Sequence, residues 1–174
     1  MHETTANDRI SLAAINAMNQ EEFSTALGGL LEGSPHLVAR AWAARPFANL
    51  AEVHVAVMDS VNAATQDEKL ALLRAHPDLG DRLTRLSLAS TKEQAKAGLD
   101  QMKPDEVAQF QYLNAQYRER NGFPFIICAP LNSKRTILAA FVRRLRKSRE
   151  AEFQTALDQV SKIARLRLAD RVTE

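Results

Sequence analysis

The segment REAEFQTALDQVSKIARLRLADR (residues 149–171), near the end of the chain, decides the fold. Phe153, Leu157, Val160 and Ala164 recur in it every three or four residues, which is the spacing of one face of an α-helix. The segment therefore predicts a long helix over its whole length, with these four side chains packed against the rest of the protein.

Arg167 occupies the next inward position of that face, seven residues after Val160 and three after Ala164. An arginine at an inward position must extend its charge to solvent, pair with a carboxylate, or contact an anionic ligand. Spacing alone leaves all three alternatives open, and it makes Arg167 a candidate for ligand binding.

Helix-start and helix-stop signals divide the rest of the chain into further helices. Capping pairs, prolines at first helical positions and glycines after last turns mark the limits. The predicted helices cover 11–18, 19–33, 34–45, 65–76, 90–102 and 104–121, and two more open at 49 and 133. With six Gly, six Pro and no alternating strand pattern, we expect an all-α chain. It has a flexible N-terminus over 1–9 and a single compact domain over 10–172, with about eight or nine helices and short loops.

The composition excludes several classes of protein. The one cysteine, Cys128, cannot form an internal disulfide or a cysteine-rich metal site. The four histidines show no metal-ligand spacing, so we expect no metal. The N-terminus lacks the apolar core of a signal peptide, and no apolar run approaches the length of a membrane helix. We therefore expect a cytoplasmic protein with no membrane partner.

A cluster of basic residues suggests a different function. It consists of Lys134, Arg135, Arg143, Arg144, Arg146, Lys147 and Arg149. One interpretation is a helical module that binds nucleic acid. The net charge is only +2 and the one aromatic residue in the cluster, Phe141, lies on an apolar stripe, so we interpret Arg143, Arg144, Arg146 and Lys147 as a solvated face. A non-catalytic dimerisation module is a second alternative.

The stretch Ala75-His76-Pro77-Asp78-Leu79-Gly80 is the first candidate for catalysis. Proline disfavours the helical conformation of the preceding residue, so His76 should lie where a helix ends. There its imidazole can cap the last carbonyls of the helix, or it can be directed into a cleft as a general acid or base near pH 7. Asp78 either orients His76 or caps the next turn.

Two further segments combine a structural with a functional interpretation. Ser90 and Glu93 form a capping box, and the same helix start, with Gln94, offers polar groups to an anionic or polar ligand. Residues 122–129, Gly-Phe-Pro-Phe-Ile-Ile-Cys-Ala, are too short between their prolines for a stable helix. They form either a core connector or an extended backbone whose N–H and C=O groups bind the amide edges of a ligand.

Together these segments resemble the OHCU decarboxylase family (2-oxo-4-hydroxy-4-carboxy-5-ureidoimidazoline decarboxylase). The matching pieces are Glu32-Gly33-Ser34-Pro35, Ala41-Trp42, Arg45-Pro46-Phe47, His76 to Gly80, Ser90 to Ala95, Ala97-Gly98-Leu99, Tyr117, Gly122 to Ile126 and Ile163 to Leu168. They follow the family's order over about residues 10–172. The chain departs from the family pattern at His36, where a tryptophan is usual, and at Asn121, where phenylalanine is common.

The resemblance implies roles for individual residues. The catalytic residues would be His76, Glu93 and Arg167. The substrate-binding residues would be Pro77, Ser90, Glu93, Gln94, Phe125, Ile127 and Arg167. The family's contacts through the backbone would fall on Phe125 and Ile127 or their neighbours. It also implies a homodimer without metal or organic cofactor.

The resemblance implies a carbon–carbon lyase. It would decarboxylate the ureidoimidazoline to (S)-allantoin and CO2, the last step from urate to allantoin. Its pathway neighbours would be urate oxidase and hydroxyisourate hydrolase. Loss of CO2 leaves an electron pair that the adjacent C=N system of the substrate can delocalise, which explains how the reaction proceeds without a cofactor.

Overall fold

The computed structural model describes residues 9–80 and 88–174. Of the predicted flexible N-terminus, residues 1–8 lie outside the described part. Within the described part, none of the helices combines the length and the apolar composition that crossing a lipid bilayer requires.

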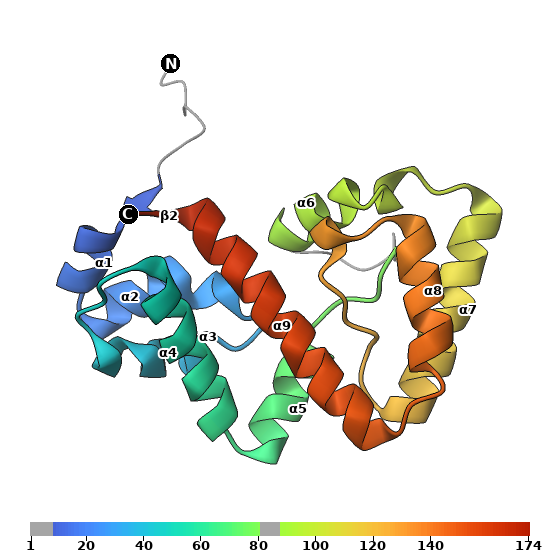
Figure 1. The fold of residues 1–174 in the computed structure, drawn as a ribbon, viewed down its shortest axis with the longest axis horizontal. Helices are drawn as coiled ribbons and strands as arrows, with labels where there is room; N and C mark the ends of the chain where they lie inside the picture. Colours follow the sequence, from blue (N-terminus) through green and yellow to red (C-terminus); the bar gives the residue numbers. More distant parts are fainter. Residues whose placement is uncertain (1–8, 81–87) are drawn as a thin grey trace. The chain divides into compact units, whose positions relative to one another are not determined.

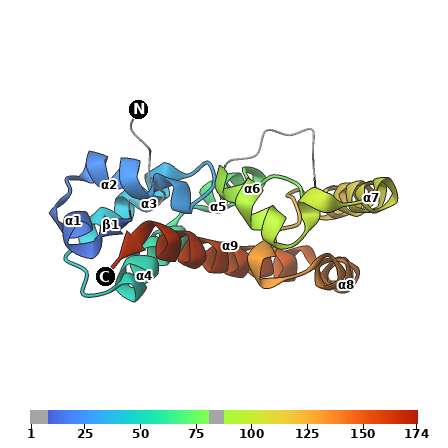
Figure 2. The same ribbon diagram turned by 90° about the horizontal axis from the view of Figure 1, so that it is seen from above.

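The described residues are mainly α-helical, which confirms the predicted fold class (Figure 1). The α-helices are α1 (Leu12–Ala17), α2 (Gln20–Leu27), α3 (Pro35–Arg40), α4 (Leu50–Ala63), α5 (Gln66–Arg74), α6 (Leu88–Lys96), α7 (Pro104–Asn121), α8 (Lys134–Arg144) and α9 (Arg149–Arg171). Short 3-10 helices cover Gly28–Leu30, Ala41–Ala44, Leu99–Gln101 and Ala129–Leu131. The long C-terminal helix has the limits that its pattern predicts, and both views show it unbroken (Figure 1 and Figure 2).

The chain packs as two compact units, and α9 contributes to both. Unit 1 comprises residues 1–69 and 163–174, and unit 2 comprises residues 70–162. The predicted single domain over 10–172 stays a prediction.

Unit 1 contains a short β-sheet that periodicity does not predict. Two strands of two residues each, β1 (Ile10–Ser11) and β2 (Val172–Thr173), pair in parallel, with Ile10 opposite Val172 (Figure 1). The guanidinium of Arg9 donates to the carbonyl of Val172 at 2.7 Å. On the surface of the same unit Arg40 pairs with Glu68 at 2.5 Å, and this hydrogen bond lowers the pKa of Glu68 to about 2.

Unit 2 is built around a cluster of aromatic rings. Tyr117 on α7 meets Phe125 edge to face at a centroid distance of 5.2 Å, and Phe125 stacks on Phe141 of α8 at 3.7 Å. Phe123 and Phe153 extend the cluster to α9. All five side chains are at most 5% exposed, so they form the core that holds the segment after α7 in place.

The predicted helix limits are confirmed where the signal is local. The side chains of Asn19 and Glu22 cap each other's backbone N–H groups, as do those of Thr65 and Glu68. Gly122 ends α7 in the left-handed conformation with φ 77°. The helix predicted over 19–33 ends earlier, because a 3-10 turn follows Leu27.

Candidate active site

His76 follows α5 and is 7% exposed. Its ring Nδ1 lies 2.9 Å from the carbonyl oxygen of Leu72. A carbonyl oxygen only accepts hydrogen bonds, so Nδ1 carries the hydrogen and Nε2 is the unprotonated nitrogen of the neutral ring. The predicted cap is therefore present at Nδ1, and it presents Nε2 as the nitrogen that can exchange a proton.

Asp78 pairs with α7. Its carboxylate accepts a hydrogen bond from Nε of Arg118 at 2.9 Å, and both side chains are partly exposed. This contact fastens the loop after His76 to the neighbouring helix, so Asp78 acts as an anchor of the loop.

The peptide group between Leu79 and Gly80 is held at both ends. Its carbonyl accepts from Nδ2 of Asn114 at 2.9 Å, and its N–H donates to Oε1 of Gln94 at 2.9 Å. Gly80 has φ 71°, a conformation that favours glycine. Asn114 on α7 and Gln94 on α6 thus fix the turn that follows His76. Sequence patterns do not single out Asn114, because its partner lies 35 residues away.

The predicted helix start at Ser90 is wrong. α6 already includes Leu88, so Ser90 lies inside the helix and does not cap it. Ser90 and Gln94 lie one turn apart and are 4% and 7% exposed, whereas Glu93 is half-buried. The three side chains therefore lie on one face of the first turns of α6, and Ser90 is not the N-cap of this helix.

The apolar segment after α7 is buried and has no helix or strand between 124 and 128, as predicted. Phe125 and Ile127 are 1% and 8% exposed. The 3-10 turn Ala129–Leu131 that ends the segment packs against α6. Since Gln94 of α6 also holds Gly80, these contacts bring the loop after His76, α6 and the end of the segment together in unit 2.

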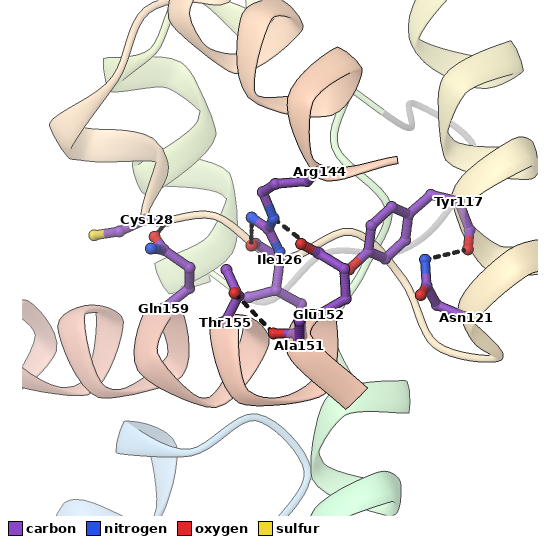
Figure 3. Close-up of polar contacts among 9 residues, drawn as sticks. All are labelled: Tyr117, Asn121, Ile126, Cys128, Arg144, Ala151, Glu152, Thr155 and Gln159. Carbon is purple, nitrogen blue, oxygen red and sulfur yellow. Dashed lines mark hydrogen bonds and ion pairs between the residues drawn. The ribbon is translucent and has the colours of Figure 1, made fainter. Parts of the chain in front are cut away.

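Arg144 does not belong to a solvated face, so the interpretation of the basic cluster is wrong for this residue. Its guanidinium is buried and donates to Glu152 at 2.8 Å and to the carbonyl of Ile126 at 2.7 Å, and it lies 4.2 Å from the ring centroid of Phe125 (Figure 3). Tyr117 donates its hydroxyl to the same carboxylate at 2.5 Å. Burial and this hydrogen bond raise the pKa of Tyr117 above its ordinary value.

Arg167 lies in unit 1, whereas the other predicted site residues lie in unit 2. Its guanidinium forms an ion pair with Glu32 at 2.9 Å and donates to the carbonyl of Gly29 at 3.1 Å. The predicted inward position is confirmed, with the arginine 9% exposed. Of the three alternatives for such an arginine, pairing with a carboxylate is present.

Among the described residues, no three His, Cys, Asp or Glu side chains are grouped as a metal ion would require. The polar side chains of the candidate site in unit 2 are the imidazole of His76, the hydroxyl of Ser90, the carboxylate of Glu93 and the amide of Gln94. Such groups can transfer a proton and orient a polar substrate.

Comparison with known proteins decides the family. The model of the family described as OHCU decarboxylase matches residues 16–169. The chain belongs to the OHCU decarboxylase family. A 2-oxo-4-hydroxy-4-carboxy-5-ureidoimidazoline decarboxylase of Haloferax volcanii is 43% identical over 98% of both chains, and one of Mus musculus is 37% identical over 92% of each. The uric acid degradation bifunctional protein PucL of Bacillus subtilis is 39% identical over 92% of this chain and 32% of its own length.

Two solved structures share the fold of this chain. A crystal structure of (S)-allantoin synthase matches 94% of this chain and 54% of its own, with 29% identity and a TM-score of 0.74. A structure of an OHCU decarboxylase in the presence of (S)-allantoin matches 87% of this chain and 96% of its own, with a TM-score of 0.66 and 22% identity, which supports the fold alone.

Proposed function

We propose that this chain is an OHCU decarboxylase, which converts 2-oxo-4-hydroxy-4-carboxy-5-ureidoimidazoline to (S)-allantoin and CO2 without a cofactor. The proposal is carried by His76, whose buried ring is fixed through Nδ1 and offers Nε2 for proton transfer. The family to which the chain belongs, and relatives of that name matching over nearly its whole length, support it.

The reaction breaks the bond between the carboxylate carbon and the ring carbon that also carries the hydroxyl. The bonding electrons stay on the ring carbon and are delocalised into the adjacent C=N unit, and a proton then completes the product. His76 acts as the general acid or base, at the hydroxyl or at the developing carbanion. Protonation from one side of the ring gives the (S) product.

The remaining residues bind and orient the substrate. Glu93 holds N–H groups of the ring or the ureido arm, and Ser90 adds a hydroxyl. Because Oε1 of Gln94 accepts from Gly80, its amide nitrogen is the end that donates to a substrate carbonyl. This fixed orientation of the amide sharpens the role of Gln94 from a general polar contact to that of a donor.

Arg167 is the partner for a carboxylate or an oxyanion of the substrate. Its existing pair with Glu32 balances its charge, which weakens its attraction for the departing carboxylate. Tight binding of that carboxylate would stabilise the ground state and would not raise the rate. Arg167 therefore contributes to kcat only through contacts that persist as charge moves into the ring.

The test generates the substrate from urate with urate oxidase and hydroxyisourate hydrolase, and follows the chirality of allantoin by circular dichroism. Spontaneous decay gives a racemate, so the wild-type protein should accelerate the decay and yield one enantiomer. His76→Ala should lose the acceleration while its helical spectrum is retained. His36→Ala, at a half-exposed histidine of unit 1, is the matched control and should keep full activity. A His76→Ala variant with wild-type rate would show that the histidine is not catalytic.

We also propose that the protein works as a homodimer in the cytoplasm, beside the two enzymes that generate its substrate. The match to a bifunctional uric acid degradation protein supports the pathway. Light scattering coupled to size-exclusion chromatography should give twice the 19.3 kDa mass of the chain, and a monomer mass would refute the dimer.

A further inference from the structure

The apolar segment after α7 is held by two polar side chains that the sequence does not mark as functional. Arg144 of α8 donates through Nη1 to the carbonyl oxygen of Ile126 at 2.7 Å. Gln159 of α9 accepts through Oε1 from the N–H of Cys128 at 2.9 Å (Figure 3). These two contacts fall on either side of Ile127.

Because the peptide bond is planar, these two contacts also fix the directions of the N–H and C=O groups of Ile127. The peptides joining Ile126, Ile127 and Cys128 are trans, and in a trans peptide the C=O and the N–H point in opposite directions. Since the carbonyl of Ile126 faces Arg144, the N–H of Ile127 points away from that guanidinium. Since the N–H of Cys128 faces Gln159, the carbonyl of Ile127 points away from that amide. Each anchor therefore binds one group of a peptide and leaves the opposite group, the N–H or the C=O of Ile127, pointing to the other side.

Arg144 is itself held from several sides. Its side chain is 3% exposed, and that of its ion-pair partner Glu152 is 0% exposed. The guanidinium lies over the ring of Phe125, and Glu152 accepts a second hydrogen bond from Tyr117. A guanidinium fixed by an ion pair and by an aromatic ring has little rotational freedom, so the carbonyl of Ile126 has a well-defined direction.

We propose that Arg144 and Gln159 are positioning residues which fix the N–H and C=O of Ile127 as a donor–acceptor pair for the ureide edge of the substrate. A ureide offers an N–H beside a C=O, and a single residue that presents one donor and one acceptor matches that edge. This inference rests on the proposed function, because the ureide is its substrate. Neither positioning residue touches the reacting atoms, and each acts through the backbone.

Gln159 gives the sharper test, because it is uncharged and only half-buried. Gln159→Leu removes the acceptor for Cys128, whereas Gln159→Glu keeps an acceptor oxygen. We expect the leucine variant to raise KM about tenfold with kcat changed less, since a lost hydrogen bond that acts on substrate binding is of this size. The glutamate variant should restore most of the affinity. Thr155→Val, which removes a hydrogen bond to Ala151 one turn earlier on α9, is the matched control and should behave as wild type.

A binding measurement separates this inference from the proposed function. In an NMR titration with (S)-allantoin, the amide of Ile127 should shift in the wild-type protein, and Gln159→Leu should need about tenfold more ligand for the same shift. A wild-type protein that leaves the decay of the substrate unchanged but shows this shift would refute the decarboxylase and keep the positioning. An Ile127 amide that does not respond, or a leucine variant that titrates and turns over like wild type, would overturn the positioning.

Arg144→Lys tests the other anchor, because lysine keeps the charge and loses the planar guanidinium. A folded variant, judged by its helical circular dichroism, should show the same rise in KM and a weaker Ile127 shift. Should it fail to fold, the Gln159 variants decide alone. A folded Arg144→Lys protein with the KM and the shift of wild type would exclude Arg144 as a positioning residue.

Discussion

Removing both members of the buried Arg144–Glu152 pair should destabilise the protein far less than the sum of the two single removals. The ion pair lies in unit 2, where the two side chains are 3% and 0% exposed. Arg144→Met leaves the carboxylate of Glu152 buried without its cation, and Glu152→Leu leaves the guanidinium buried without its anion. The double variant leaves no buried charge at this place.

The structure sets the size of the effect. Breaking a buried pair by removing one partner costs about 3–5 kcal/mol of unfolding free energy. Within the described residues, Nη2 of Arg144 and Oε1 of Glu152 have no hydrogen-bond partner, so the pair is incompletely satisfied and we expect about 3 kcal/mol for each single variant. The double variant leaves only neutral groups unpaired, the carbonyl of Ile126 and the hydroxyl of Tyr117, at about 1–3 kcal/mol each. Burial of the apolar methionine and leucine side chains in the double variant offsets part of this cost.

Urea denaturation at pH 7, followed by circular dichroism, measures these free energies in the wild type, both single variants and the double variant. The expected coupling energy is about 2–3 kcal/mol, because the cost in the double variant falls well below the sum of the single costs. Single variants that each lose less than about 1 kcal/mol, or losses that add within about 0.5 kcal/mol, would refute the reasoning.

The other predictions concern pH and one turn. Because the pKa of Tyr117 is raised in the folded protein, the free energy of unfolding should fall above about pH 10. The Tyr117→Phe variant should be less stable at neutral pH but should not show this fall. Urea midpoints measured from pH 8 upward test both expectations. Glu68 has a lowered pKa, so its stabilisation is present above about pH 4.5 and lost toward pH 2; Glu68→Gln should flatten that acid limb, and an unchanged limb would contradict it. Gly80→Ala should lower the free energy of unfolding by about 1–2 kcal/mol from its positive φ alone, and by more because the new Cβ would lie 2.3 Å from Met102. The same variant should lower kcat/KM. In Gly29→Ala the new Cβ meets nothing within 4 Å, so this control should be neutral in both assays.

Local signals predict most of the helix limits. Pro104 begins α7 at its first helical position, and Gly122 ends it in the left-handed conformation. Such signals act within one turn, so they can be recognised from neighbouring residues alone. The Ser90–Glu93 pair shows that the spacing of a capping box does not by itself locate a helix start, because the same spacing also occurs inside a helix that has already begun.

The buried polar groups were harder to recognise. Arg144 stands among exposed basic residues, which favoured a solvated face, yet it lies three residues after Phe141 and seven after Ile137 on the buried stripe of α8. The same periodicity that marks Arg167 as inward could have marked Arg144. Its burial depends on Glu152 on another helix, and the partner that neutralises a charge comes from the tertiary fold.

Contacts between distant segments could not be predicted from the sequence. Asn114 and Leu79 are 35 residues apart, and nothing in the pattern of either segment indicates that they meet. The predicted roles of His76, Glu93 and Arg167 come from resemblance to a family, and they stay predictions until the variants are measured.

The pairing of β1 with β2 places the first and last described segments of the chain side by side, with Ile10 opposite Val172. Adjacent strands lie about 4.8 Å apart, so the two ends of the fold could be joined by a short peptide. A circular permutant that joins these two segments and has its new ends in an exposed turn is therefore feasible.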